Sequence, residues 1–245
     1  MQDDTRRDRS TSGRQRLVWQ VLAQAIASVS TSARPAVVLD CGGGSGSFAV
    51  PLAQAGAQVT VVDVSVDALA TLSRRADEAG VADRVRPVQC DVESLADAVP
   101  VASFDLVLAH GILEAVDHVA PAFDAIVATV RTGGLLSVLV GNPVAGVLGR
   151  ALSGDIAAAL RELRALDADV GHSGPPAVQA LCRAAGLLVE QVHGIGVFAE
   201  LVAGSALDAP GALEALADLE AETAVRAPFC DIASRVHVLA RRPAA

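Results

Sequence analysis

The sequence predicts an α/β protein with a doubly wound, mostly parallel sheet and helices on both faces. Two observations carry this prediction. Short apolar runs rich in Val, typical of buried strands, alternate with longer segments of helical composition from residue 37 to residue 140. The first run breaks directly into a glycine-rich turn, which permits positive φ angles and close approach of the backbone to a bound molecule. Because strands that alternate with helices are joined by right-handed crossovers, they form a parallel sheet.

Composition, hydrophobic periodicity and the positions of Gly and Pro predict each helix and strand. In the first helix, Leu17, Val21, Leu22, Ile26 and Val29 recur at spacings of three and four, which indicates an amphipathic helix. We expect helices at residues 14–29, 48–56, 66–79, 120–130, 144–168, 178–185 and 210–225. We expect strands at residues 37–40, 58–62, 85–90, 104–109, 135–140, 187–197 and 235–240. Residues 1 to about 12 are polar, and we expect them to be disordered.

Composition narrows the class of protein. The 245 residues are 52% hydrophobic, which is ample for a large core, but no apolar stretch approaches the roughly 18 residues of a membrane span. The polar N-terminus carries no secretory signal pattern, so we expect a cytoplasmic protein without a membrane partner. Four scattered cysteines without paired spacing predict reduced thiols and no metal site. A net charge of −9 offers no global basic footprint for nucleic acid.

Acids end the first three predicted strands, at Asp40, Asp63 and Asp91. Ligands of doubly wound sheets bind outside the carboxyl ends of the strands, so the three acids surround one crevice. Asp63 lies about twenty residues beyond the glycine turn, the position from which a carboxylate accepts hydrogen bonds from ribose hydroxyls. We therefore expect a ligand that contains a nucleoside.

The glycine turn by itself leaves two kinds of ligand open. Gly44 and Gly46, followed by Ala49, form a loose dinucleotide fingerprint, which would suit a nicotinamide-dependent oxidoreductase. Asp40, however, stands two residues before the first glycine, where its charge would repel phosphates and attract a cation. The sequence thus favours a cationic nucleoside over a pyrophosphate.

The register of Asp40, Gly42, Gly44 and Gly46, with Asp63 and Asp91 downstream, resembles the class I S-adenosylmethionine-dependent methyltransferases. This resemblance implies a seven-stranded Rossmann-like sheet and S-adenosylmethionine as cofactor. It also implies that Gly42, Gly44 and Gly46 lie under the methionine portion and that Asp63 binds the ribose. By the same resemblance, Asp91 and Val92 face the adenine, and His110 borders the reaction chamber.

A narrower resemblance involves the segment from His110 to Glu114, Asn142 after the fifth strand, and the region from Arg226 to His237. These motifs are similar to those of the methyltransferases that esterify uridine-5-oxyacetic acid at the tRNA wobble position. The resemblance implies a tRNA partner, with Arg226 or Arg235 orienting the substrate carboxylate and His110 positioning the substrate. A small-molecule O- or N-methyltransferase is the alternative within the class, and a non-catalytic cofactor-binding protein is the alternative outside it.

The resemblance also suggests a domain organisation. We expect residues 1–34 to form a disordered arm and a lid helix, and residues 35–245 to form one methyltransferase domain. Residues 143–177 would be a lid-like helical insertion within that domain. The sequence leaves the oligomeric state open.

Overall fold

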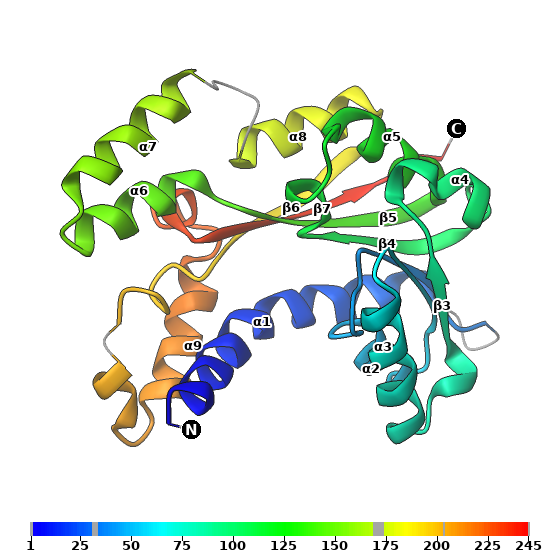
Figure 1. Ribbon diagram of the computed structural model, residues 1–245, viewed down its shortest axis with the longest axis horizontal. Coiled ribbons are helices and arrows are strands. Elements are labelled where there is room, and N and C mark those ends of the chain that lie inside the picture. Colours follow the sequence, from blue (N-terminus) through cyan, green and yellow to red (C-terminus); the bar gives the residue numbers. More distant parts are fainter. Residues whose placement is uncertain (1, 31–33, 169–173, 203, 245) are drawn as a thin grey trace. The chain divides into compact units, whose positions relative to one another are not determined.

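The computed structural model describes residues 2–30, 34–168, 174–202 and 204–244. A seven-stranded sheet has the order β3-β2-β1-β4-β5-β7-β6 (Figure 1). Its strands are β1 (Val37–Cys41), β2 (Gln58–Asp63), β3 (Val85–Gln89), β4 (Phe104–His110), β5 (Val130–Gly141), β6 (Leu188–Ile195) and β7 (Arg235–Arg241). Every strand range that we expected overlaps one of these strands.

Strand directions confirm the mostly parallel sheet. β1 is parallel to β2 and β4, β2 is parallel to β3, and β4 is parallel to β5. β7 runs the other way: the N–H of Gly133 donates to Arg242 O at 2.8 Å, and the N–H of Arg242 donates to Gly134 O at 2.9 Å. This reciprocal pair is typical of antiparallel strands. An antiparallel strand between β5 and β6 distinguishes the sheet from the order 3-2-1-4-5-6 of dinucleotide-binding folds.

Each expected helix is present, with two differences, and the short α4 was not expected. They are α1 (Gln2–Val29), α2 (Ala49–Gln54), α3 (Val66–Glu78), α4 (Leu95–Ala98), α5 (Val119–Thr129), α6 (Pro143–Leu152), α7 (Ile156–Ala168), α8 (Gly174–Ala184) and α9 (Ala212–Thr223). The helix expected at residues 144–168 is divided into α6 and α7, because Gly154 adopts a left-handed φ of 86° that ends the first of them.

The other difference concerns the N-terminus, where disorder was the wrong prediction for the backbone. Residues 2–12 continue α1 toward its amino end. The chain has no proline between Gln2 and Val29, and Arg and Gln are good helix formers, so a helix that begins near residue 14 can extend through this polar stretch.

Backbone contacts divide the chain into two compact units. We call the first the glycine-turn unit; it comprises Gln24–Leu139, Ala180–Glu190 and Leu239–Ala245. The second, the accessory unit, comprises Met1–Ala23, Val140–Gln179 and Gln191–Val238. No helix among the described residues is long and apolar enough to cross a membrane. The domain boundaries at residues 34 and 35, the lid role of residues 143–177 and the cytoplasmic location stay predictions.

In the glycine-turn unit, β4 is the central strand, and every residue from Phe104 to Ala109 is buried. Helices α2 and α3 lie on one side of the sheet, and α4 and α5 lie on the other (Figure 1). α3 turns Leu69, Leu72 and Ala76 inward, a spacing of three and four that matches its helical period. Ser65 caps α3, because its hydroxyl accepts a hydrogen bond from Ala68 N at 3.2 Å.

A buried carboxylate fixes the amino ends of the central strands. Asp105 is fully buried and accepts two hydrogen bonds from the Arg34 guanidinium, at 2.7 and 2.9 Å, and one from Val37 N at 2.8 Å. Arg131 donates to it as well. Burial acts to raise the pKa of Asp105, but these hydrogen bonds outweigh burial and hold the pKa below its ordinary value.

Candidate functional site

The glycine turn follows β1 and is built from alternate left-handed residues. Gly42, Gly44 and Gly46 have φ angles of 70°, 53° and 81°, which residues other than glycine rarely adopt. Space is restricted too, because a Cβ on Gly46 would lie 2.3 Å from Leu72 Cδ1. The turn therefore needs glycine at these positions, and Gly42 brings its backbone to the pocket described below.

Asp63 links the end of β2 to the glycine turn. Its Oδ2 accepts a hydrogen bond from Gly44 N at 2.9 Å, and its Oδ1 accepts one from Ser65 N at 2.9 Å. Each carboxylate oxygen has a further lone pair for a ligand hydroxyl. The carboxylate is thus positioned by two backbone groups at the place where the sequence predicts a ribose contact.

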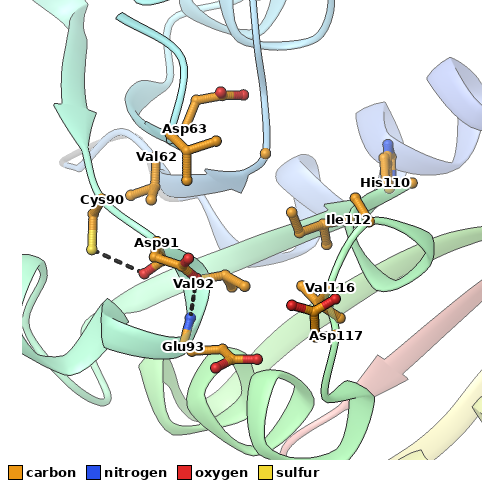
Figure 2. A pocket seen from close by; sticks show the side chains of 14 residues that line it. Val62, Asp63, Cys90, Asp91, Val92, Glu93, His110, Ile112, Val116 and Asp117 are labelled. Carbon is orange, nitrogen blue, oxygen red and sulfur yellow. Dashed lines mark hydrogen bonds between the residues drawn. The ribbon is translucent and has the colours of Figure 1, made fainter.

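A pocket of about 440 Å³ opens beside this turn (Figure 2). It lies within the glycine-turn unit, at the carboxyl ends of β1, β2, β3 and β4. Five predicted site residues line it: Gly42, Asp63, Asp91, Val92 and His110. The structure therefore brings together residues that are up to 68 positions apart in the sequence at the edge where the strand order predicts a ligand.

Gly44, Gly46 and Asp40 do not line this pocket. Gly44 is held by Asp63, and Gly46 is buried against α3. Asp40 lies beneath the turn, with only 2% of its surface exposed, and a Cβ on Gly43 would fall 2.5 Å from its Oδ2. Gly44 and Gly46 shape the turn, and Asp40 places a carboxyl group beneath it.

Asp40 is an unusual carboxylate. Its Oδ2 is buried and has no hydrogen-bond partner among the described residues. Burial, followed by the nearby charge of Asp63, raises the pKa of Asp40 to about 7. A cation above the turn would stabilise the ionised form, so the buried carboxylate suits a positively charged ligand.

Asp91 both caps a short helical turn and lines the pocket. Its Oδ1 accepts a hydrogen bond from Glu93 N at 2.9 Å, which caps the short helical turn after β3. It also lines the pocket, where Figure 2 shows it beside Val92. Capping occupies one oxygen and leaves the other for a ligand.

His110 ends β4 and is half-buried at the pocket. Its Nε2 lies 2.8 Å from the hydroxyl of Ser137 on β5, and its ring meets Phe48 edge-on at 4.6 Å between centroids. These contacts fix the orientation of the imidazole. An imidazole with a fixed orientation at the wall of the pocket is suited to positioning a substrate.

Sequence reasoning missed one wall of the pocket. Ile112, Val116 and Asp117 lie in the segment after β4 and face the same space as Val92 in Figure 2. Ile112 also packs on the turn, because a Cβ on Gly42 would lie 2.9 Å from its Cδ1. The available signal was the apolar and acidic pattern directly after His110, which a search based on strand ends passes over.

Acidic side chains dominate the lining of the pocket. Asp63, Asp91, Glu93 and Asp117 all line it, and no Arg does so among the described residues. Carboxylates at this density repel phosphates and attract cations. No group of three or more His, Cys, Asp or Glu in the described part of the chain could hold a metal ion. The residues present fit a cationic nucleoside such as S-adenosylmethionine and do not fit a dinucleotide.

Two of the residues expected to handle the substrate, Arg226 and Arg235, lie in the accessory unit. Arg235 begins β7 with an exposed side chain, and Ser234 beside it accepts a hydrogen bond from Asn142 N at 2.9 Å. Arg226 forms an exposed ion pair with Glu222, four residues earlier in the chain. Asn142 is buried and contacts backbone, so its role is structural.

Comparisons with known proteins agree with the fold. Residues 39–138 match the family model of the methyltransferase domain. The tRNA 5-carboxymethoxyuridine methyltransferase of Escherichia coli strain K12 is 26% identical over 235 residues, which cover 94% of this chain and 88% of that protein.

Solved structures share the fold at lower identity. Magnesium protoporphyrin IX methyltransferase from Synechocystis PCC 6803 superposes with a TM-score of 0.57 and 14% identity, over 94% of this chain and 80% of that chain. The [4+2]-cyclase SpnF superposes with a TM-score of 0.56 and 19% identity, over 91% and 80%. Fold similarity alone therefore does not fix the reaction. Taken with the family match and the pocket, the fold identifies the chain as a class I S-adenosylmethionine-dependent methyltransferase.

Proposed function

We propose that this methyltransferase transfers a methyl group to the carboxylate of a modified uridine at the tRNA wobble position. The observation that carries the proposal is the extent of the similarity to the Escherichia coli enzyme. It covers 235 residues, whereas the methyltransferase family model covers residues 39–138 only. The similarity therefore includes parts of the chain beyond the common cofactor-binding region, and acceptor recognition commonly differs in those parts.

We assign the cofactor to the pocket of the glycine-turn unit. When bound, S-adenosylmethionine supplies an electrophilic methyl group on a sulfonium. Asp63 would accept hydrogen bonds from the ribose hydroxyls, and Asp91 with Val92 would border the adenine. Asp40 would stabilise positive charge through the turn formed by Gly42, Gly44 and Gly46.

The acceptor makes few chemical demands on the protein. A carboxylate is already anionic at neutral pH, so it needs alignment and removal of water rather than a general base. In the glycine-turn unit, His110, fixed by Ser137 and Phe48, would position the acceptor. In the accessory unit, taken by itself, Arg235 is the candidate for binding a carboxylate. Arg226 is the weaker candidate because Glu222 already neutralises it.

The proposal is tested by methylation of tRNA with labelled S-adenosylmethionine. Bulk tRNA is first treated with mild alkali, which hydrolyses methyl esters and exposes the free carboxylates. We expect label to enter treated tRNA, to be lost after RNase digestion, and to be released again by alkali because the product is an ester. Label that resists alkali, or that enters small metabolites but not tRNA, would contradict the proposal and favour another methyl acceptor.

A further inference from the structure

Aromatic side chains are scarce in this chain, and one of them is unusually placed. The sequence contains five Phe, one Trp and no Tyr. Among the described residues Phe229 is the single exposed Phe or Trp, with 39% of its surface accessible. Its ring contacts that of half-buried Phe198 at 5.8 Å between centroids, with the ring planes inclined by 46°. Both residues belong to the accessory unit.

The backbone that carries Phe198 is held by a buried carboxylate. Glu220 is only 7% exposed and lies on α9. It accepts hydrogen bonds from the N–H groups of Val197, Phe198 and Ala199 at 2.8, 2.8 and 2.7 Å. Three charge-assisted bonds fix the loop after β6, so Phe198 has a defined position before any ligand arrives.

The backbone that follows Phe229 is held from two sides. The side-chain amide of Asn142 donates to the carbonyl oxygens of Asp231 and Ala233, both at 2.9 Å. Gly194 lies directly against the same turn, because a Cβ there would fall 2.7 Å from Cys230 Cα. These contacts join the turn after Phe229 to the end of β6, the strand that leads to Phe198.

A rigid, partly exposed aromatic ring is suited to stacking on another planar ring. Nucleobases stack on aromatic side chains in most single-stranded RNA sites, because every base has a π face. A ring with a fixed backbone loses little conformational freedom on stacking.

We propose that Phe229, supported by Phe198, is a stacking platform for an unpaired nucleobase of the acceptor RNA. This inference rests on the proposed tRNA acceptor and adds the residue that recognises the base. Stacking on a ring of this kind typically changes affinity by about tenfold to a hundredfold when the ring is removed. Arg235, exposed at the start of the following strand, would then contact the anionic group of the same acceptor.

The test compares Phe229→Leu with Phe229→Tyr. Leu keeps apolar bulk but has no π face, whereas Tyr keeps the ring. We expect Phe229→Leu to raise KM for tRNA about tenfold or more, with the Kd for S-adenosylmethionine and the Tm unchanged. Phe229→Tyr should restore KM. Leu201→Ala, an exposed apolar residue of the same unit, is the matched control and should behave like the parent. Equal KM values for Phe229→Leu and the parent would contradict the proposal that Phe229 is a stacking platform.

A second readout does not depend on methyl transfer. Phe229→Trp places a fluorophore on the platform, and we expect saturable quenching by an oligouridylate that is absent from a Leu201→Trp control. Quenching without any methylation of tRNA would support the platform while contradicting the proposed reaction. Absence of quenching at position 229 would overturn the platform whatever the reaction proves to be.

Discussion

The two units of the chain are organised by different means. In the glycine-turn unit, the site depends on strand ends and on contacts such as that between Asp63 and Gly44, which are 19 residues apart. In the accessory unit, buried side chains hold distant segments, as when Asn142 binds the carbonyl of Asp231, 89 residues away. The cofactor pocket thus lies at strand ends and a glycine turn that have recognisable sequence patterns, whereas the candidate acceptor surface depends on buried polar contacts that have none.

The largest expected effect comes from removing the carboxylate that organises the accessory unit. Glu220→Ala leaves three N–H groups without their acceptor, so we expect a loss of about 3–5 kcal/mol in the free energy of unfolding. Unfolding by urea measures this loss in the free energy of unfolding. Affinity for S-adenosylmethionine, measured on the folded fraction, should change less than twofold if the two units act separately.

Glu222→Ala is the matched control for that change. Glu222 lies on the same helix, but its side chain is 64% exposed and forms an exposed ion pair with Arg226. We expect a loss of no more than about 0.5 kcal/mol. Equal losses for the two variants would contradict the role given to Glu220, and a parallel loss of cofactor affinity would contradict the separation of the units.

The next largest effect concerns Asp105, which joins Arg34, Val37 and Arg131 in the glycine-turn unit. Asp105→Asn should cost about 2–4 kcal/mol, because two guanidinium groups lose their charged acceptor. The pKa of Asp105 is lowered by folding, so its contribution is present above the unfolded pKa and is lost as the pH falls through the folded pKa. The difference in Tm between parent and variant should therefore shrink in acid, and a constant difference would contradict this account.

The contrast between the units also explains which features could be predicted from the sequence. Glycine turns, strand-end acids and helix caps have short sequence patterns, so Asp63, Asp91 and the cap at Ser65 were identifiable before the structure. Asn142 was noted only as part of a resemblance, and Glu220 looks like an ordinary polar residue of a helix. Their roles depend on which segments the fold places beside them, and no local pattern carries that information.

The third prediction is a pH dependence of cofactor binding. The pKa of Asp40 is raised to about 7, so the carboxylate is neutral at lower pH and charged at higher pH. Affinity for S-adenosylmethionine should rise roughly tenfold between pH 6 and pH 8, because the charged form attracts the cation. Without ligand, the same shift should lower stability as the pH rises from about 4 to 7, since ionisation is less favourable in the folded chain.

Calorimetric titrations across this range provide the measurement, with Asp40→Asn as reference. The variant has no titrating group at this position, so the difference between its profile and that of the parent reports Asp40 alone. Identical profiles for the two proteins would show that Asp40 does not influence the charge of the ligand site.

The smallest effects distinguish the two arginines of the accessory unit. Arg226→Gln disrupts only an exposed pair and should change KM for tRNA less than twofold. Arg235→Gln removes an exposed cation at the start of β7 and should raise that KM several-fold if it binds the acceptor carboxylate. Steady-state kinetics measure KM for tRNA in both variants. A larger increase for Arg226→Gln than for Arg235→Gln would assign carboxylate binding to Arg226 instead.

The most direct test of the account is a calorimetric titration of S-adenosylmethionine into the parent protein, Asp63→Ala and Glu220→Gln. The pocket of the glycine-turn unit is the cofactor site in this account, so the parent and Glu220→Gln should bind at similar micromolar concentrations. Asp63→Ala should bind at least tenfold more weakly, because the ribose loses its acceptor and Gly44 loses its anchor. Affinity that survives Asp63→Ala but falls with Glu220→Gln would contradict the central claim.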